Sequence, residues 1–236
     1  MPNHVINVLE FTGSDEDIKE LMAKIKPRKG EFGWDYEPSE DECIDFNQII
    51  PMPDSIRNTE SSSRSLYGII VYLTNRLFDN LPANANKYLH NSDLYERAKN
   101  QDFSDEEIEE LYKMGRNLCD NQDKYGCKDW YDWSCRYWGT KWNAYSQSKL
   151  LDNKIEFSTA WCAPFEVICA LSEMFPEVEI RHTYADEDLG SNCGEVVWFE
   201  GDEIETMIFS DDREAYEFAC RAWGLLPDWD DEDDEE

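Results

Sequence analysis

Histidines and cysteines are the side chains with which this sequence could carry out acid–base or nucleophilic chemistry. His182 shares a predicted strand face with Ile180 and Tyr184, an environment typical of a core histidine rather than of a catalytic base. His4 lies at the start of a predicted strand, where it could cap the strand or line a pocket. Cys162 precedes a predicted helix, where a thiolate could be stabilised, but no histidine partner is evident. These residues therefore favour structural roles over catalytic ones.

The chain also lacks the short motifs that mark common enzyme classes. It contains no glycine-rich dinucleotide or phosphate loop, no serine-hydrolase elbow and no paired-histidine zinc motif. Residues 121–132 resemble a calcium-binding EF-hand loop, but Tyr125 is unsuited to its ligand position and the final bidentate glutamate is missing. Cys119, Cys127 and Cys135 recur every eight residues without a CxxC pair, so reduced thiols are favoured over zinc. We therefore expect no catalytic residue, no metal ion and no cofactor.

The most aromatic stretch is YWGTKWNAYS at residues 137–146, whose alternating pattern predicts a strand. Trp138 and Trp142 share one face of this strand, and we expect both to be core residues, because buried aromatics dominate core energetics. Two further tryptophans, Trp161 and Trp198, are expected in the same layer. The opposite face carries the surface candidates for binding a partner, which are Lys141, Asn143 and Tyr145.

The chain is strongly acidic, with 53 aspartates and glutamates against 22 lysines and arginines and a net charge of −31. Residues 228–236 contain eight acids and no base, so residues 1–227 still carry −23. Such a surface repels nucleic acid and anionic membranes, and it attracts basic protein surfaces. RNA binding by sheet aromatics is disfavoured, because it needs a basic groove. Solubility, or a salt-adapted source, is the alternative explanation of the charge.

Two acidic clusters of the folded part are the candidate contacts with a basic partner. The first lies on a predicted helix and the second in a predicted hairpin loop. They comprise Glu106, Glu107, Glu109 and Glu110 on the helix, and Asp186, Glu187 and Asp188 in the loop. The loop carboxylates could hold a metal ion, but a solvated hairpin with an electrostatic role is favoured.

Hydrophobic periodicity and capping residues predict an α+β fold. Helices are predicted at residues 14–25, 66–81, 103–118, 128–136, 163–175 and 210–224, and a polar linker at 58–65. Strands are predicted at residues 4–11, 43–53, 137–146, 155–161, 179–188 and 195–203. We expect an antiparallel sheet covered on one face by helices. It would form a single domain over residues 1–227, with a helical insertion at about 55–136 and a disordered acidic tail at 228–236.

Five segments carry a resemblance to known proteins: MPNH at 1–4, DFNQIIPMP at 45–53, YWGTKWNAYS at 137–146, FSTAWCAPFEVICALSEMFP at 157–176 and YADEDLGSNCGE at 184–195. They resemble the YubB-like group of uncharacterised phage and plasmid proteins, whose shared module is described as a ferredoxin-like domain. The resemblance implies that fold and a mobile-element origin, with a role in conflict between phage or plasmid and host. It does not extend to residues 55–125 or to the acidic tail, and it implies no established activity.

Two classes of function follow from these features. The first is a non-enzymatic, anti-CRISPR-like inhibitor that mimics nucleic acid and binds a basic surface of a host nucleic-acid-binding defence complex. The second is a small-ligand or metal-binding enzyme that uses the loop at 184–195 with Asn143 and Tyr145. No apolar run approaches the roughly 18 residues needed to span a bilayer, and the N-terminus lacks a signal-peptide pattern. We therefore expect a cytoplasmic protein, located in the host cell if it is phage-encoded.

Overall fold

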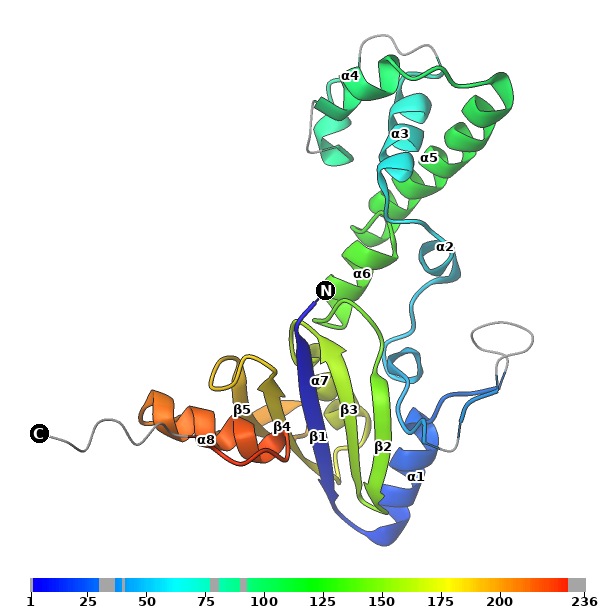
Figure 1. The fold of residues 1–236 in the computed structure, drawn as a ribbon. Helices are drawn as coiled ribbons and strands as arrows, with labels where there is room; N and C mark the ends of the chain where they lie inside the picture. The colour runs from blue at the N-terminus through cyan, green and yellow to red at the C-terminus, as the bar shows by residue number, and fades with distance from the viewer. Residues whose placement is uncertain (1, 30–36, 40, 77–80, 90–92, 229–236) are drawn as a thin grey trace, which may run out of the picture. The chain divides into compact units, whose positions relative to one another are not determined.

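A computed structural model describes residues 2–29, 37–39, 41–76, 81–89 and 93–228 of the protein (Figure 1). Its contacts divide the chain into two compact units. The sheet unit comprises Met1–Pro51 with Cys135–Glu236, and the helical unit comprises Met52–Ser134. The predicted disordered tail falls almost wholly on residues 229–236, which lie outside the described residues. In the part of the chain that is described, no helix is long and apolar enough to cross a membrane.

The described residues of the sheet unit form one six-stranded sheet, in the order β2-β3-β1-β4-β5-β6. Every neighbouring pair of strands is antiparallel, which confirms the predicted α+β class. The strands are β1 (His4–Thr12), β2 (Tyr145–Leu151), β3 (Lys154–Ala160), β4 (Glu179–Asp186), β5 (Cys193–Phe199) and β6 (Asp202–Thr206). The helices of this unit are α1 (Asp15–Ile25), the 3-10 turn η1 (Phe46–Gln48), α7 (Phe165–Met174) and α8 (Asp212–Ala222).

One face of the sheet holds the main apolar core. Alternation along β1 places Leu9 and Phe11 on this face, and both are fully buried. Phe157 of β3 shares the face and packs edge-on against Phe46 of η1, with ring centroids 5.8 Å apart. Phe165 at the start of α7 packs against the rings of β4 and β5 on the same face. The burial of these aromatic rings joins α7 and η1 to the sheet.

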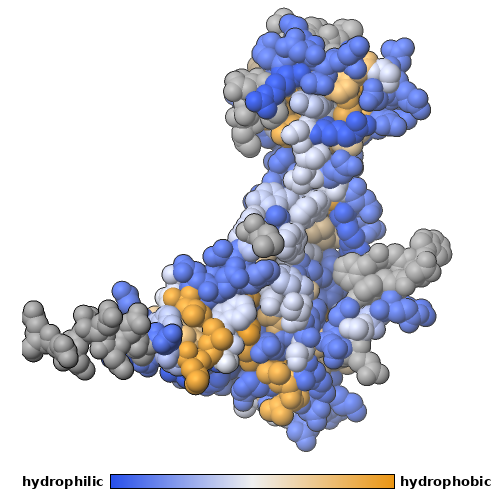
Figure 2. All heavy atoms as spheres, viewed as in Figure 1, coloured by the Kyte–Doolittle hydropathy of each residue, from blue (hydrophilic) through white to orange (hydrophobic). Residues whose placement is uncertain are grey.

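Helix α8 lies on the opposite face of the sheet from α7 (Figure 1). Its Ala219 is fully buried against Ile6 of β1 and Ala185 of β4. Successive strand residues point to opposite faces, so Tyr184 contacts α7 through Phe165 while Ala185 contacts α8. Helices therefore contact both faces at β4, whereas the sequence predicted one covered face. Figure 2 shows hydrophobic side chains gathered over α8 on an otherwise largely hydrophilic surface of the sheet unit.

Three predicted strands differ from the observed elements. Residues 43–53 form no strand and contain the 3-10 turn η1 at Phe46–Gln48, because the carboxylate of Asp45 caps the turn by accepting from the backbone N–H of Asn47. Residues 137–144 form no strand, since α6 (Trp130–Tyr137) runs into this stretch and Gly139 then turns at φ +72°. Residues 195–203 are divided between β5 and β6 by a turn at Glu200 and Gly201, whose φ values are +53° and +85°.

The helical unit contains α2 (Asp54–Arg57), α3 (Ser63–Leu73), η2 (Ala85–Lys87), α4 (Asp93–Lys99), α5 (Asp105–Tyr125) and the first turns of α6. The predicted capping box at the start of α5 is confirmed, with Ser104 and Glu107 each bonding the other's backbone N–H. Helix α3 begins inside the predicted linker, because the Ser62 side chain accepts from the N–H of Ser65 and caps the helix.

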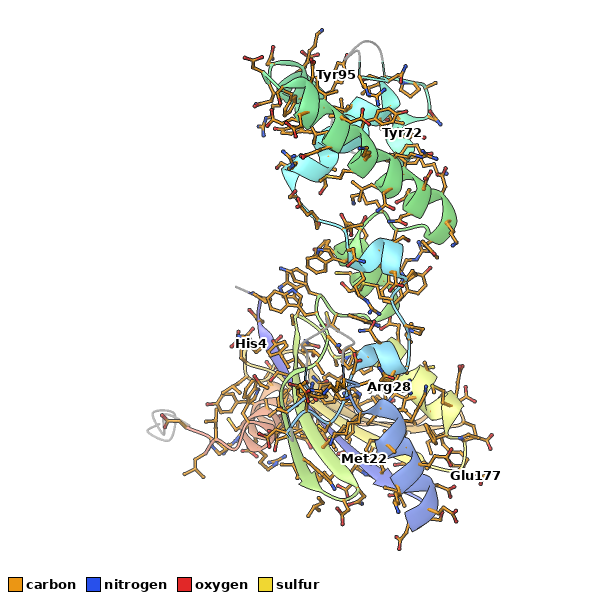
Figure 3. All side chains as sticks on the ribbon, turned by 90° about the vertical axis from the view of Figure 1, so that its right-hand side faces the viewer. His4, Met22, Arg28, Tyr72, Tyr95 and Glu177 are labelled. Carbon is orange, nitrogen blue, oxygen red and sulfur yellow. The ribbon has the colours of Figure 1, made fainter. Side chains whose placement is uncertain are left out.

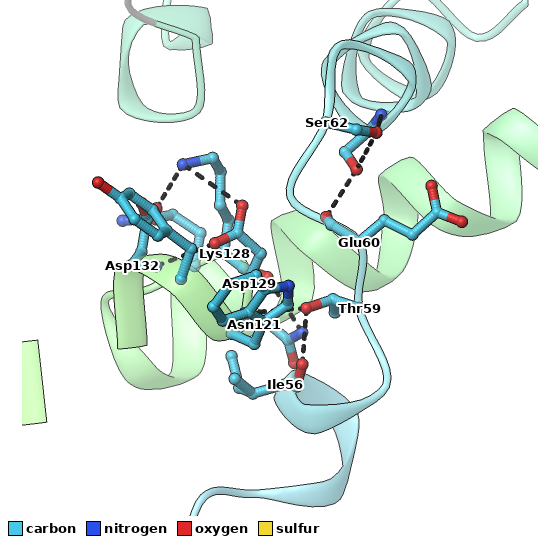
Figure 4. Close-up of polar contacts among 12 residues, drawn as sticks. Ile56, Thr59, Glu60, Ser62, Asn121, Lys128, Asp129 and Asp132 are labelled. Atoms are coloured by element: carbon cyan, nitrogen blue, oxygen red, sulfur yellow. Dashed lines mark hydrogen bonds and ion pairs between the residues drawn. The ribbon is translucent and has the colours of Figure 1, made fainter. Parts of the chain in front are cut away.

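Polar contacts join α2, α5 and α6 at the base of the helical unit (Figure 4). The Asn121 amide bonds both the backbone carbonyl and the hydroxyl of Ser55, at 2.9 and 2.7 Å. Buried Asp129 accepts from the backbone N–H of Asp132, and Lys128 forms an ion pair with Asp132. Asn121 and Tyr125 belong to α5, so residues 121–132 are not an EF-hand loop.

Gly68 and Gly115 allow α3 and α5 to cross at backbone contact, and Gly115→Ala is expected to destabilise the helical unit. A Cβ at Gly115 would overlap the carbonyl group of Gly68. We expect a loss of about 1–3 kcal/mol in the free energy of unfolding, since overpacking outweighs alanine's higher helix propensity. Chemical denaturation measures the loss, with Glu106→Ala, an exposed change on the same helix, as the control. A variant as stable as the wild type would contradict the close crossing.

Candidate functional site

The start of β1 and the ends of β3 and β4 meet at one end of the sheet. In the strand registers His4 is opposite Ala160, and Val5 is opposite Asp186. Figure 3 shows His4 at this end, with Met22 and Glu177 toward the other. Several side chains singled out in the sequence are gathered here. We call the following set the sheet-end cluster: Asn3, His4, Lys141, Trp142, Tyr145, Trp161, Cys162, Asp186 and Asn192.

A hydrogen-bonded pair at the cluster joins His4 to Tyr145. The Tyr145 hydroxyl donates its single proton to the carbonyl of Thr159 at 2.9 Å, so Nδ1–H of His4 must donate to that hydroxyl at 2.7 Å. This arrangement leaves Nε2 of a neutral His4 as a hydrogen-bond acceptor. Burial, and next the negative charge of Glu187, raise the pKa of Tyr145, which keeps the phenol protonated.

Lys141 lies between two exposed tryptophans. Its ammonium is 4.7 Å from the ring centroid of Trp142 and 4.9 Å from that of Trp161. The two tryptophans are 38% and 39% exposed, so the prediction that they belong to the core is wrong. The reason for Trp142 is that residues 137–144 are not a strand, and for Trp161 that β3 ends at Ala160, so alternation does not decide the burial of either side chain. Trp138 and Trp198 are buried, at 4% and 3% exposed.

Trp161 adopts a backbone conformation that bulky residues rarely take, with φ at +75°. Its N–H donates to the carbonyl of Asn3 at 2.9 Å, and its carbonyl accepts from the side chain of Asn192 at 3.1 Å. These two bonds hold Trp161 just beyond the end of β3, although the sequence predicted it to be the last residue of a strand at 155–161. Local strain of this kind is concentrated at functional sites, and it is the feature of the cluster that favours ligand contact.

Asp186 organises the hairpin loop instead of presenting a carboxylate to a partner. It is 5% exposed, and its carboxylate accepts from the Asn3 side chain at 3.1 Å, the Asn192 side chain at 3.3 Å and the backbone N–H of Asp188 at 2.9 Å. The prediction of Asp186 as a contact residue is therefore wrong, because its position at the end of β4 buries it. Glu187 and Asp188 are exposed and can meet a partner.

Asn143 also has a structural role that differs from the predicted one. Its side chain donates to the carboxylate of Asp45 at 2.6 Å and accepts from the backbone N–H of Phe46 at 2.9 Å. These bonds attach η1 to the segment that precedes β2. The sequence placed Asn143 on an open strand face, and that placement is wrong because the segment is a turn that packs against residues 45–46.

Cys162 is exposed beside the cluster, but its surroundings do not activate it. Burial of the sulfur, and then the negative charges of Asp186 and Glu166, raise the pKa of this thiol. A nucleophilic cysteine needs the opposite, a pKa lowered by surroundings that stabilise the thiolate. The cluster can therefore bind through aromatic rings, amides and the His4 imidazole, but its electrostatics oppose thiolate chemistry.

The acidic row predicted on α5 is largely neutralised within the helical unit. Glu109 forms ion pairs with Arg76 at 2.6 Å and Lys113 at 3.7 Å, and Glu110 pairs with Arg64 at 2.9 Å. The side chain of Glu107 closes the capping box with Ser104, and that backbone hydrogen bond lowers its pKa. Glu106 is exposed. Three of the four predicted contact residues thus already have partners, which weakens this row as a docking surface.

The negative charge is concentrated in the sheet unit. The helical unit, Met52–Ser134, contains 15 acidic and 10 basic residues, a net charge of −5. The remaining 38 acidic and 12 basic residues give the sheet unit −26, of which the last nine residues contribute −8. Within the ranges that the structure describes, no group of three or more His, Cys, Asp or Glu side chains is arranged to hold a metal ion.

The sequence patterns did not predict the structural role of Asn3 or the pairing of His4 with Tyr145. Asn3 holds both Trp161 and Asp186, and His4 bonds a residue 141 positions away in the chain. No spacing or periodicity reports such contacts, because they depend on the order of the strands. The hydroxyl of Tyr145 and the ring of His4 were visible only as polar side chains near predicted strand ends.

The comparison with known families identifies the sheet region. Residues 138–225 match the family model described as a ferredoxin-like domain in Api92-like protein. This match, which spans β2 to α8, confirms the ferredoxin-like fold that the sequence resemblance implied. It does not extend to the helical unit. None of the curated proteins matches the chain.

Among solved structures, the chain is similar to the crystal structure of a protein api92 from Yersinia pseudotuberculosis. The two are 12% identical, and the alignment covers 89% of this chain and 99% of that chain with a TM-score of 0.41.

Proposed function

We propose that this chain is a non-enzymatic acidic protein that binds a basic surface of a partner protein. The observation that supports the proposal is the charge of the sheet unit, −26 on a folded ferredoxin-like unit and its short tail. The chain has 31 more acidic than basic residues, since 53 acids are present with 22 bases. Such a field attracts a basic surface at long range and opposes binding of nucleic acid.

The partner we propose is a nucleic-acid-binding protein, with the carboxylates replacing backbone phosphates in its basic groove. The resemblance to phage and plasmid proteins supports a mobile-element origin, and with it a host defence complex as the target. The protein would then act as an anti-CRISPR-like inhibitor in the host cytoplasm. A nucleic-acid mimic must compete with nucleic acid for the same groove, and this competition is what separates mimicry from solubility as the reason for the charge.

A second candidate is a small-ligand binder or enzyme at the sheet-end cluster. The strained Trp161 and the Nε2 acceptor of His4 favour this candidate. The raised pKa of Cys162 and the structural roles of Asp186 and Asn143 disfavour it. Native mass spectrometry of protein purified from its source would detect a bound metabolite or metal ion and so support this candidate.

The complex with a captured host protein is expected to weaken steeply with salt and to be displaced by duplex DNA. The Debye length falls from about 10 Å at 0.1 M salt to about 3 Å at 1 M, which removes long-range attraction. Deleting residues 228–236 should weaken binding modestly, because eight of the 53 acids lie there. Affinity measured at several salt concentrations, with and without duplex DNA, checks the proposal.

Reversal variants indicate which acids make the contact. Glu187→Lys with Asp188→Lys, at two exposed positions, should weaken the complex more than the tail deletion does. The matched control is Glu109→Lys with Glu110→Lys. It changes the net charge by the same amount, at carboxylates that already have ion-pair partners. A salt-insensitive complex, or one that duplex DNA does not displace, would show that the chain is not a nucleic-acid mimic.

A further inference from the structure

A hollow of about 560 Å³ lies between α7 and the β5–β6 hairpin of the sheet unit. Phe165 and Trp198 contribute aromatic rings to its lining, and they pack against each other with centroids 6.2 Å apart. The remaining lining residues are Glu166, Cys169, Ala170 and Glu173 from α7, and Gly201, Asp202 and Glu203 from the hairpin. Aromatic rings and carboxylates thus line the same open hollow.

The four carboxylates of the hollow are Glu166, Glu173, Asp202 and Glu203, and the lining contains no basic side chain. Within the described part of the chain none of the four forms an ion pair, in contrast to Glu109 and Glu110 on α5. All four contribute negative charge that raises the pKa of Cys169, after the larger effect of burial. Like charges gathered over aromatic rings repel one another, and a cation relieves that repulsion.

The hollow is bordered by the edge of the sheet. β6 is the last strand in the sheet order, and all five of its residues are exposed. Ile204, 51% exposed, lies on this strand, and Met207 and Ile208 follow it at 44% and 87%. An exposed edge strand offers backbone N–H and C=O groups to an added strand. Its carboxylates disfavour pairing between two copies of this chain, but they favour an added strand that is basic.

Trp198 is the more deeply buried of the two aromatic side chains that line the hollow. Its side chain is 3% exposed, and its indole Nε1–H is buried without a hydrogen-bond partner among the described residues. A buried N–H that lacks an acceptor costs free energy, so such groups are rare in folded proteins.

We propose that the hollow and the edge of β6 together bind an extended basic segment of a partner protein. The segment lies along β6 as an added strand, and one of its lysine or arginine side chains enters the hollow over Phe165 and Trp198. Charge complementarity identifies this occupant, because four carboxylates without ion pairs line an open hollow that has no basic side chain in its lining. The inference rests on the proposed function, since it names the surface at which the acidic protein meets its basic partner.

A synthetic twelve-residue peptide of alternating lysine and valine is the probe, with a glutamate–valine peptide as its control. Titration of the full chain is followed by tryptophan fluorescence and calorimetry. Glu166→Gln with Glu173→Gln should weaken binding of the basic peptide by about tenfold or more, since two charge-assisted contacts are lost. The matched variant Glu106→Gln with Glu110→Gln removes the same charge from α5 and should change affinity by about twofold or less, as expected for distant, screened charges.

A second probe tests the strand contact without altering the protein. N-methylation of alternate residues keeps the charge of the peptide but removes the N–H groups that an added strand needs, so this peptide should bind at least about tenfold more weakly. Equal affinity of the methylated peptide, or equal losses in the α7 and α5 variants, would overturn the proposal. Self-association of the Glu166→Gln, Glu173→Gln variant, with no peptide binding by the wild type, would show that the carboxylates only keep edge strands apart.

The outcomes for this surface and for the proposed function can be separated. If a captured basic protein still binds the α7 variant with full affinity and is still displaced by duplex DNA, the inference about the hollow is wrong but the proposed function stands. If neither the basic peptide nor a basic protein binds the wild type at low salt, the proposed function itself is wrong.

Discussion

Replacing Trp138 by alanine is expected to destabilise the sheet unit by about 3–5 kcal/mol, whereas the same change at Trp142 should cost about 1 kcal/mol. Trp138 is 4% exposed, donates from Nε1 to the carbonyl of Ile50 at 2.9 Å and packs edge-on against Phe46. Its removal leaves a cavity and an unpaired carbonyl. Trp142 is 38% exposed and mainly loses its contacts with Lys141 and Tyr145.

The free energy of unfolding of each variant, from chemical denaturation, checks this expectation. The pair is well matched, because the same side chain is removed from one short segment and only the burial differs. Equal losses for the two variants would mean that Trp142 is a core residue after all. Loss of partner binding in a stable Trp142→Ala variant would instead assign the exposed tryptophans to recognition.

Acid is expected to destabilise the fold through His182, which is fully buried between the sheet and α7. Burial lowers the pKa of this imidazole to about 3, and its Nε2 bonds the side-chain oxygen of Asn7 at 3.0 Å. Since the amide nitrogen of Asn7 donates to Val5 and Thr159, its oxygen accepts from Nε2–H, and His182 is neutral in the fold. The unfolded chain binds a proton here below pH 6.5, which the folded chain cannot do above pH 3.

The contribution of His182 to stability is therefore complete above pH 6.5 and is lost as the pH falls toward 3, by about 1.4 kcal/mol for each pH unit. Carboxylates also titrate in this range, so the measurement compares the pH dependence of the unfolding free energy between the wild type and variants. The unfolding free energy of His182→Gln, which can still donate to Asn7 but cannot be protonated, should depend less steeply on pH. The control is Tyr184→Phe, which changes a ring that packs against His182 but keeps the imidazole. Its unfolding free energy should have the same slope against pH as that of the wild type. Identical slopes in all three proteins would show that His182 takes up a proton in the folded chain as readily as in the unfolded chain.

Most of the regular elements were predictable because their signals are local. The capping box of Ser104 and Glu107, and the alternation of residues 155–160, depend only on neighbours in the chain. Strand predictions were wrong where a side-chain contact or a turn overrode the alternation of apolar and polar residues. Residues 137–144 alternate like a strand but follow directly from α6, and Asp45 turns residues 46–48 into η1. The turn at Gly201 likewise divided one predicted strand into two.

Composition and short-range periodicity were enough to predict the α+β class, the buried position of His182 and the acidic net charge of the chain. Which carboxylates are free to contact a partner depends on the tertiary structure. It paired Glu109 and Glu110 with Arg76 and Arg64, it buried Asp186, and it brought Glu166 and Glu203 together around one hollow. The physical reason is that a carboxylate's availability depends on the cations and donors that lie within a few ångströms of it, and strand order and helix packing place those groups there from distant parts of the chain.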